Sequence, residues 1–234
     1  MAQVRFALPP YRNASTALAV SVVVASVVWK LAADSGLVLY FMPGLVLRGQ
    51  VWQLATWIWA ARPDTMSVLF SALIIWLTGG SLEYSWGRKR FLQFVIITLT
   101  AAALLTLGLA ALAPQVGSVP FFGAQVMSSI VWVGYGCSIW RGGTNIFGFP
   151  VTGRNFALLG VLLVALNGIF GGLVTIIPEA FALAMTFAYA LYGWPTQAWV
   201  RFRSRQLDRD LKRRSSHLRP MDGGRRGRDD DFLN

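Results

Sequence analysis

Few residues in the apolar part of this chain could carry out chemistry, and the group that would activate them is missing from it. Ser128 and Ser129 lie in an uncharged stretch, and a serine hydroxyl becomes an effective nucleophile only when a nearby base removes its proton. The sole histidine, His217, lies in a charged C-terminal segment. Lys30 is the one candidate replacement, so the sequence allows only a Ser–Lys dyad of Lys30 with Ser128 or Ser129.

The same residues have ordinary structural roles in apolar helices. A serine within a helix commonly donates to the backbone of the preceding turn. A lysine near the end of a membrane helix extends its amine toward the lipid headgroups, which is what we expect of Lys30. Glu179 lies at the turn between two apolar stretches and is expected to be a solvated boundary residue rather than a base. We therefore predict no catalytic residues.

Metal and cofactor chemistry is not indicated either. Cys137 is the only cysteine, so it cannot form an intramolecular disulfide. The sequence has no cluster of cysteine and histidine with the spacing of a metal site. We expect no metal and no cofactor.

Long uncharged stretches predict helices that cross a membrane. Hydrophobic residues make up 55% of the chain and charged residues 13%, which is unlike a soluble globular domain. No charged residue occurs within 91–140, 155–178 or 180–200, and about 20 apolar residues suffice to cross the hydrocarbon core. We predict six spans, near residues 14–33, 66–82, 91–113, 120–140, 156–177 and 180–198, within a membrane domain of residues 1–200.

The positions of the basic residues predict the orientation of these spans. Most arginines and lysines lie before the first span, between the second and third, between the fourth and fifth, or after the sixth, and basic loops stay in the cytoplasm. We expect a multi-pass integral membrane protein with both termini cytoplasmic. Its short loops and small size favour a bacterial inner membrane. Topology and anionic lipids explain the net charge of +11 without nucleic acid.

The first loop, residues 34–64, has few charges and many aromatic side chains. Aromatic rings with a polar edge favour the boundary between headgroups and hydrocarbon. We predict that this loop lies half-immersed in the outer leaflet, and the alternative is an ordinary packed extracellular loop. The rings are those of Tyr40, Phe41, Trp52, Trp57 and Trp59.

Two stretches resemble the rhomboid family of intramembrane serine proteases. Residues 49–56 resemble the first-loop motif of that family, although Gln53 follows Trp52 where rhomboids usually carry arginine. Residues 67–87 resemble the second span and its exit. The resemblance implies an all-α, polytopic membrane fold: a six-transmembrane-helix rhomboid-like bundle with a half-immersed loop 1. The structural positions that match the motifs are Trp52, Gln53, Gly79, Glu83, Trp86 and Gly87.

The resemblance also implies where the protease chemistry would lie, and each of these positions is changed. Gln125 stands at the family's nucleophile position and Phe181 at the position of its base. Ser67 and Ser71 stand where rhomboids carry the histidine and asparagine of the oxyanion site. The resemblance therefore implies a catalytically inactive pseudoprotease. Residues 147–149, 154–156 and 167–172 additionally resemble the derlins, inactive relatives implicated in handling misfolded membrane proteins.

Glu83 keeps the family's acidic residue although the chemical positions have changed. At the end of the second span it could accept hydrogen bonds from loop backbone and pair with Arg88 or Arg90. An exposed ion pair contributes at most about 1 kcal/mol, so we expect Glu83 to be partly buried if it supports the fold.

Small residues in the fifth and sixth spans indicate close helix approach. They could pack the sixth span against the fourth, or offer a face to the transmembrane helix of a client protein. The second span holds only about sixteen residues before its polar end, and so short a span would favour local thinning of the bilayer. The candidate client-binding residues are Gly168, Gly172, Phe181, Ala184 and Ala188.

These patterns favour a non-proteolytic, rhomboid-like pseudoprotease that binds transmembrane segments of clients and locally thins the bilayer. The alternative is a rhomboid-type intramembrane serine endopeptidase with a nonstandard dyad. A transporter or channel is disfavoured, because no ionisable residue stands in the middle of a predicted span. Residues 201–234 form a basic tail that we expect to be largely disordered and cytoplasmic and to bind anionic lipids.

Overall fold

The computed structural model describes residues 3–4, 13–32, 38–146 and 149–192. The chain divides into two units, Met1–Leu191 and Tyr192–Asn234, and everything below concerns the first. The basic tail expected at residues 201–234, together with His217, lies outside the described residues. So do residues 147–148 of the derlin-like stretch.

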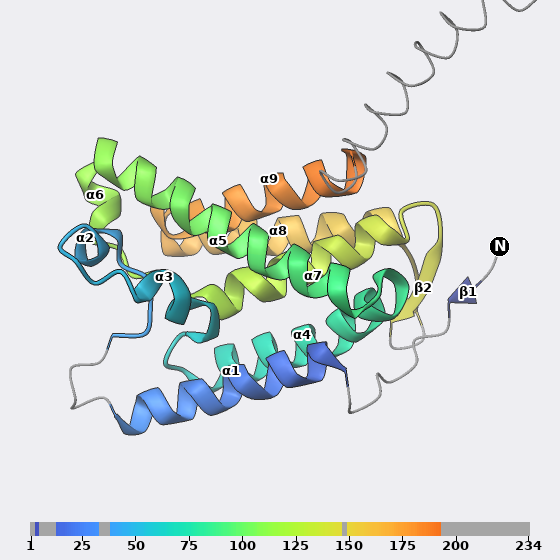
Figure 1. Ribbon diagram of the computed structural model, residues 1–234. Helices are drawn as coiled ribbons and strands as arrows, with labels where there is room; N and C mark the ends of the chain where they lie inside the picture. The colour runs from blue at the N-terminus through green and yellow to red at the C-terminus, as the bar shows by residue number, and fades with distance from the viewer. Residues whose placement is uncertain (1–2, 5–12, 33–37, 147–148, 193–234) are drawn as a thin grey trace, which may run out of the picture. The chain divides into compact units, whose positions relative to one another are not determined.

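Apolar helices dominate the described part of the chain (Figure 1). Five helical stretches are long and apolar enough to cross a membrane, and these cover five of the six predicted spans. Shorter helices, α2 (Pro43–Val46), α3 (Gln53–Thr56), η2 (Trp57–Trp59) and α6 (Pro114–Gly117), lie between them. The five stretches are α1 (Ala14–Leu31), α4 (Thr65–Trp86), α5 (Arg88–Leu112), α8 (Gly153–Gly171) and Leu173–Ala190, which joins η3 (Leu173–Ile176) to α9 (Ile177–Tyr192).

The remaining predicted span, 120–140, is a shorter helix than expected. This helix, α7 (Gly123–Ser138), has 16 residues and is therefore about 24 Å long, less than the roughly 30 Å of a bilayer's hydrocarbon core. Most of its side chains are buried. Because neighbouring helices and not lipid surround α7, it does not need the length of a lipid-exposed span. Five of the six predicted spans thus coincide with candidate membrane-spanning helices, and the predicted six-span bundle is not confirmed.

The second span is longer than the sequence suggested. Helix α4 has 22 residues, about 33 Å, because the helix continues through Gly79 and Gly80 to Trp86. Gly79 is a packing position, since a Cβ there would meet Ser15 Cβ at 3.2 Å. The prediction of a sixteen-residue span was wrong, and the argument for bilayer thinning that rested on it fails.

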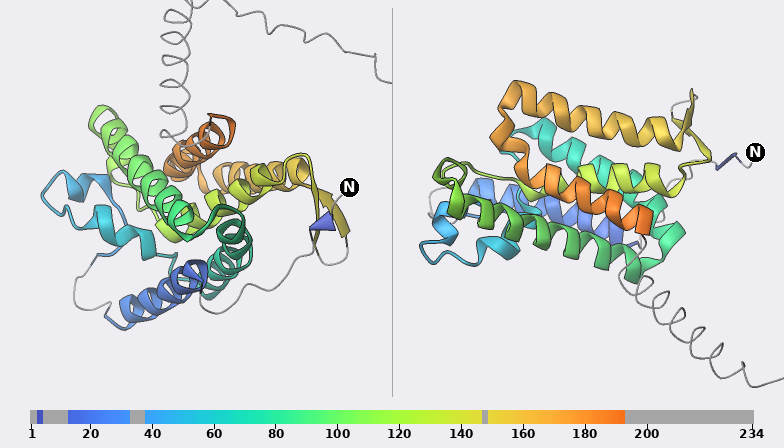
Figure 2. Two further views of the ribbon diagram at one scale, coloured as in Figure 1. Left: turned by 45° about the vertical axis from the view of Figure 1, so that its right-hand side comes forward. Right: turned by 90° about the horizontal axis from the view of Figure 1, so that it is seen from above.

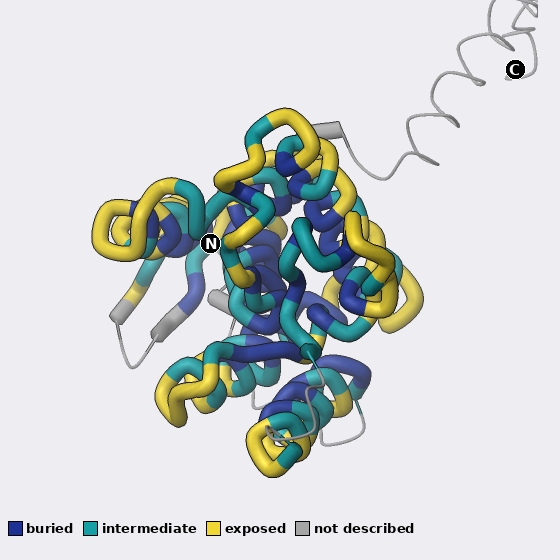
Figure 3. The backbone as a smooth tube through the Cα atoms, turned by 90° about the vertical axis from the view of Figure 1, so that its left-hand side faces the viewer, coloured by how far each residue is buried: buried dark blue, intermediate teal, exposed yellow. Residues whose placement is uncertain are grey.

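The helices pack in the order α1, α4, α7, α8, each against the next (Figure 2). Two glycine contacts bring α7 and α8 together. A Cβ on Gly136 would meet Ala157 N at 2.7 Å, and a Cβ on Gly160 would meet Trp132 Cδ1 at 2.6 Å. The Trp132 indole also donates to the Phe156 carbonyl at 2.9 Å. Along the tube in Figure 3, buried residues lie toward the centre of this arrangement and exposed residues lie on its outer side.

Glu83 joins α4 to the first turn of α1. Its two carboxylate oxygens accept hydrogen bonds from the backbone N–H groups of Ala14 at 3.0 Å and Ser15 at 2.9 Å. The side chain is 7% exposed. The N–H groups of a first helical turn have no partner within their own helix, so a carboxylate there satisfies them and interacts favourably with the helix dipole. Glu83 therefore holds a helix end of α1; Arg88 and Arg90, its expected partners, are exposed.

A glycine and a cluster of aromatic rings form the connection that follows α4. Gly87 has φ +84°, a value that favours glycine, and it links α4 directly to α5. The Trp86 ring packs edge-on against Phe94, with 5.2 Å between the ring centroids. It also packs at a tilt against Tyr189 of α9, with 4.9 Å between the centroids. This cluster fixes α9 next to α5 at this end of the molecule.

The described part of loop 1 folds onto the helix ends through buried contacts. Phe41 and Phe121 exchange two backbone hydrogen bonds, of 3.0 and 2.8 Å. Gln53 is fully buried; its Oε1 accepts from the Met42 N–H at 2.9 Å and its Nε2 donates to Gln50 Oε1 at 2.9 Å. Trp52 remains exposed. Immersion of this loop in the outer leaflet stays a prediction.

A small sheet, which the sequence did not predict, accompanies the helices. Strand β1 (Gln3–Val4) pairs in parallel with β2 (Gly143–Ile146), and β2 pairs in antiparallel with β3 (Phe149–Thr152). Strands β2 and β3 lie between α7 and α8 in the chain, whereas β1 precedes α1, and the described part of the fold is otherwise all-α.

We predict that Glu83→Gln destabilises the folded protein. An amide oxygen can replace only one of the two carboxylate acceptors, and a charged hydrogen bond in a buried place contributes about 1–3 kcal/mol. The measurement is thermal unfolding and folded yield of the full chain in detergent. Tyr84→Gln is the control, because the adjacent Tyr84 side chain is 93% exposed and makes no such bond. Equal losses in the two variants, or no loss in either, would contradict the role of Glu83.

Candidate functional site

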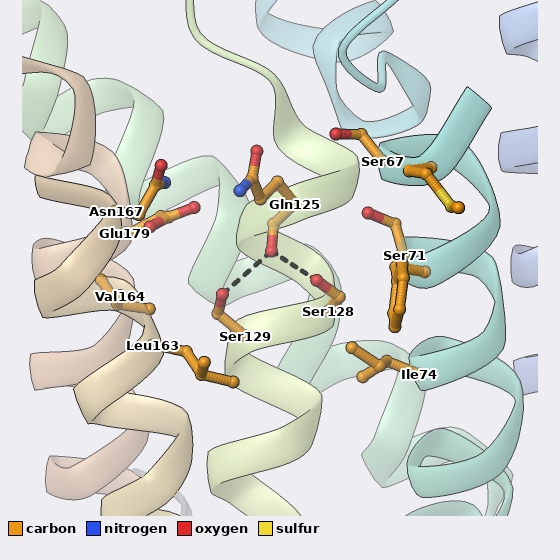
Figure 4. A pocket seen from close by; sticks show the side chains of 12 residues that line it. Ser67, Ser71, Ile74, Gln125, Ser128, Ser129, Leu163, Val164, Asn167 and Glu179 are labelled. Carbon is orange, nitrogen blue, oxygen red and sulfur yellow. Dashed lines mark hydrogen bonds between the residues drawn. The ribbon is translucent and has the colours of Figure 1, made fainter. Parts of the chain in front are cut away.

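A cavity of about 250 Å³ lies between α4, α7, α8 and α9 (Figure 4). Its lining is part polar and part apolar. The lining residues are Met66, Ser67, Phe70, Ser71, Ile74, Gln125, Ser128, Ser129, Leu163, Val164, Asn167 and Glu179.

Most of the positions singled out from the sequence come together here. Ser67 and Ser71 are one turn apart on α4 and face the cavity from one side. Gln125, with Ser128 and Ser129 one turn further along α7, forms the middle of the wall. Phe181, which stands at the position of the family's base, does not line the cavity and packs against the hydrophobic core instead.

The serines of α7 are engaged with their own helix. Ser128 Oγ donates to the Gln125 carbonyl at 2.7 Å, and Ser129 Oγ donates to the same carbonyl at 3.1 Å. Lys30 lines a different cavity, between α1 and the start of α4. The structure thus keeps the two parts of the candidate dyad in separate places.

The Gln125 side-chain amide is the polar group nearest the middle of the cavity wall. It lies between the two serines of α4 on one side and Asn167 and Glu179 on the other (Figure 4). No hydrogen bond between described residues uses this amide. A carboxamide offers two donors and one acceptor, so it can bind a ligand of either kind.

Glu179 is the residue of the site that sequence reasoning missed. The side chain is 4% exposed, and its Oε2 has no hydrogen-bond partner among the described residues. The expectation of a solvated boundary residue was wrong, because the turn through η3 directs the carboxyl inward against α8. One signal could have found it: an acid and an asparagine, Asn167, at the facing ends of two apolar stretches.

Two neighbours partly compensate the Glu179 carboxyl. Arg62 donates from its guanidinium to Asn167 Oδ1 at 3.4 Å, and both Arg62 and the Asn167 amide act favourably on the carboxylate. Glu179 also lies in the first turn of α9, where the helix dipole favours a negative charge.

A second cavity, of about 210 Å³, adjoins the same groups. It is lined by residues of the α6–α7 connection, such as Phe121 and Phe122, and by Arg62. Gln125 and Glu179 line both cavities and so stand between them. The described residues contain no group of three His, Cys, Asp or Glu that could hold a metal ion.

The small residues predicted to bind clients do not form one surface. Gly168 faces inward, because a Cβ there would meet Ile176 Cδ1 at 2.6 Å. Gly172 has φ +92° and forms the turn between α8 and η3. Ala184 and Ala188 are exposed on the outer side of α9 and do not pack it against α7.

One comparison identifies relatives of this chain. A family described as "Eukaryotic integral membrane protein (DUF1751)" matches residues 15–132, just over half of the 234 residues. The matched region runs from α1 through most of α7 and includes the α4 and α7 walls of the cavity. No curated protein matches the chain.

The family match corrects the expected location. A bacterial inner membrane conflicts with a family of eukaryotic integral membrane proteins. The inference from short loops and small size was wrong because both features are compatible with any membrane. The description of the family mentions neither rhomboids nor derlins, so that relation stays a hypothesis.

We predict that Glu179→Gln leaves the thermal stability of the protein unchanged or raises it, in contrast to Glu83→Gln. The substitution removes a buried carboxyl with an oxygen that is unpartnered among the described residues, whereas Glu83 uses both of its oxygens. Thermal unfolding of the two variants in the same detergent makes the comparison. A drop for Glu179→Gln as large as that for Glu83→Gln would show that the Glu179 carboxyl supports the fold rather than a ligand.

Proposed function

We propose that this chain, which belongs to the DUF1751 family of eukaryotic integral membrane proteins, binds transmembrane segments of client proteins without cleaving them. The observation that carries the proposal is the partly polar cavity among membrane helices, with a buried Glu179 carboxyl oxygen that has no hydrogen-bond partner among the described residues. A polar group in such a place is expensive to keep and commonly marks a functional site.

The edge of the cavity suits a helix that arrives from the lipid. Helices α4 and α8 both pack on α7, and the cavity lies between them. Phe70 of α4 and Leu163 of α8 line it and are also exposed on the apolar surface. A client helix could contact these apolar side chains and direct one polar side chain inward.

The inner wall suits a neutral polar side chain of the client. Gln125 and Asn167 supply amides, and Ser71 supplies a hydroxyl. Interhelical hydrogen bonds of this kind stabilise helix association in membranes by about 0.6–2 kcal/mol. Arg62 next to Glu179 disfavours a cationic side chain at the same place.

The absence of proteolysis is part of the proposal and rests on the geometry of the serines. The Ser128 and Ser129 hydroxyls donate to their own helix, and the Lys30 amine lines another cavity, so the described residues do not assemble the Ser–Lys dyad. A rhomboid-like pseudoprotease, with derlin-like features, fits this arrangement. Anionic lipids at the basic tail remain a prediction about residues outside the described part of the chain.

Photocrosslinking in liposomes tests client binding. Benzoylphenylalanine in place of Phe70, at the edge of the cavity, is expected to crosslink to a synthetic polyleucine helix of about 20 residues with a central asparagine. Gln125→Leu should reduce this crosslinking at least about threefold, since it removes the hydrogen-bonding amide. Crosslink yield on a gel is the measurement.

The control places the same photoreactive residue at Leu104, an exposed position on α5 that does not line the cavity. An all-leucine helix serves as the apolar comparator. Equal yields at the two positions would count against client binding at this cavity. If Gln125→Leu left the crosslink yield unchanged, the Gln125 amide would not contribute to client binding.

A fluorophosphonate probe tests the absence of serine hydrolase chemistry. We expect no labelling of the full chain and no cleavage of a labile transmembrane substrate, because the Ser128 and Ser129 hydroxyls both donate to the Gln125 carbonyl and Lys30 lines another cavity. An active rhomboid protease in the same liposomes shows that probe and substrate work. Labelling that Ser128→Ala or Ser129→Ala abolishes would establish an enzyme and overturn this proposal.

A further inference from the structure

A separate cavity of about 340 Å³ lies between the C-terminal half of α1 and the N-terminal end of α4. Its walls are largely apolar and include Val27 and Leu69, whose side chains are exposed on the surface of the helices. Three charged residues, Lys30, Arg62 and Asp64, line it at the ends of these helices. The cavity therefore combines an apolar groove with a charged end.

The charges at this end sum to a net positive charge. Asp64 caps α4, because its Oδ1 accepts a hydrogen bond from the Ser67 backbone N–H at 2.7 Å. Hydrogen bonding from Ser67 lowers the pKa of Asp64 from its ordinary value, so this carboxylate stays ionised and engaged with the helix end. Among the three charged residues that line the cavity, two are cations and one is an anion. Because Arg62 also acts on Glu179, the positive charge offered to a ligand is mainly that of the exposed Lys30.

We propose that this cavity binds a phospholipid whose headgroup carries net negative charge. An acyl chain lies along the groove between Val27 and Leu69, and the phosphate meets the Lys30 amine and the Arg62 guanidinium. A guanidinium has five N–H donors, so Arg62 can bind a phosphate oxygen while it donates to Asn167. The charge of the cavity is what selects an anionic lipid over a zwitterionic one.

This site is separate from the cavity proposed for client helices and does not depend on that proposal. The two cavities share no lining residue. It is also distinct from the basic tail, because Lys30 and Arg62 belong to or adjoin the helices of the first unit. Lipid bound here would fill the space between α1 and α4 at the end opposite Glu83.

Native mass spectrometry of the full chain tests the proposal. The protein in detergent receives palmitoyl-oleoyl phosphatidylserine or the matching phosphatidylcholine, and retained lipid is counted. We expect phosphatidylserine to be retained preferentially. Lys30→Gln should lower its retention about fivefold, the effect of one cation on an anionic lipid, with little change for phosphatidylcholine.

Three further arms make the test specific to this cavity. Lys89→Gln removes an exposed lysine that does not line the cavity and should leave retention unchanged. Val27→Trp fills the groove without changing a charge and should lower retention of phosphatidylserine. Excess glycerophosphoserine, the headgroup without acyl chains, should not displace the lipid, which distinguishes a lipid from a soluble phosphate.

The outcomes separate cleanly. Equal losses for Lys30→Gln and Lys89→Gln would show non-specific attraction and overturn the proposal. So would equal retention of the two lipids by the unmodified chain. Displacement by glycerophosphoserine would reassign the site to a soluble phosphate ester. An unchanged result for Val27→Trp alongside a loss for Lys30→Gln would exclude the groove and also overturn it.

Discussion

A carboxylate buried among apolar helices needs hydrogen-bond donors, and Glu83 has two backbone N–H donors at the first turn of α1. The two hydrogen bonds from Ala14 and Ser15 satisfy backbone groups that would otherwise be unpaired, and they fix the position of α1 against α4. Because α4 in turn packs on α7, the same contact helps to set the wall that carries Ser67 and Ser71. Glu179 is the opposite case, with an oxygen that no described residue satisfies. Two buried glutamates of one membrane domain therefore have different roles, and hydrogen-bond partners distinguish them.

The spans could be predicted from the sequence because apolar length depends on composition alone. The uncharged stretches gave five membrane-spanning helices at nearly the expected places. The errors occurred where polar residues continue a helix or a helix is shielded from lipid. Gly79 and Gly80 resembled the end of a span, yet the helix continues through them and Gly79 allows α1 and α5 to approach α4. A sequence does not show which polar residue is satisfied by a neighbouring helix, so the length of α4 and the internal position of α7 were missed.

The candidate site was predicted in part, and the reason lies in the direction of side chains. Ser67, Ser71, Gln125, Ser128 and Ser129 share a cavity because the resemblance aligned positions on two helices that do pack together. The small residues were misplaced because spacing shows only that close approach is possible. The approach of α7 to α8 uses Gly136 and Gly160, while Ala184 and Ala188 stay on the outer surface. Which side of a helix faces its neighbours depends on how the helices pack, and the sequence of a single helix does not show it.

Arg62 explains how the membrane domain tolerates the Glu179 carboxyl. Its guanidinium reaches Asn167 and acts on Glu179, while the same side chain also lines the cavity beside Lys30. A carboxylate that is partly balanced by a cation and by a helix dipole is destabilised less than an isolated one, yet its free oxygen still favours a hydrogen-bond donor. A fully apolar wall would pack as well at lower free-energy cost. The proposed client helix would complete this site, because a polar side chain can donate to the acceptor that no described residue satisfies and can bind the two amides beside it.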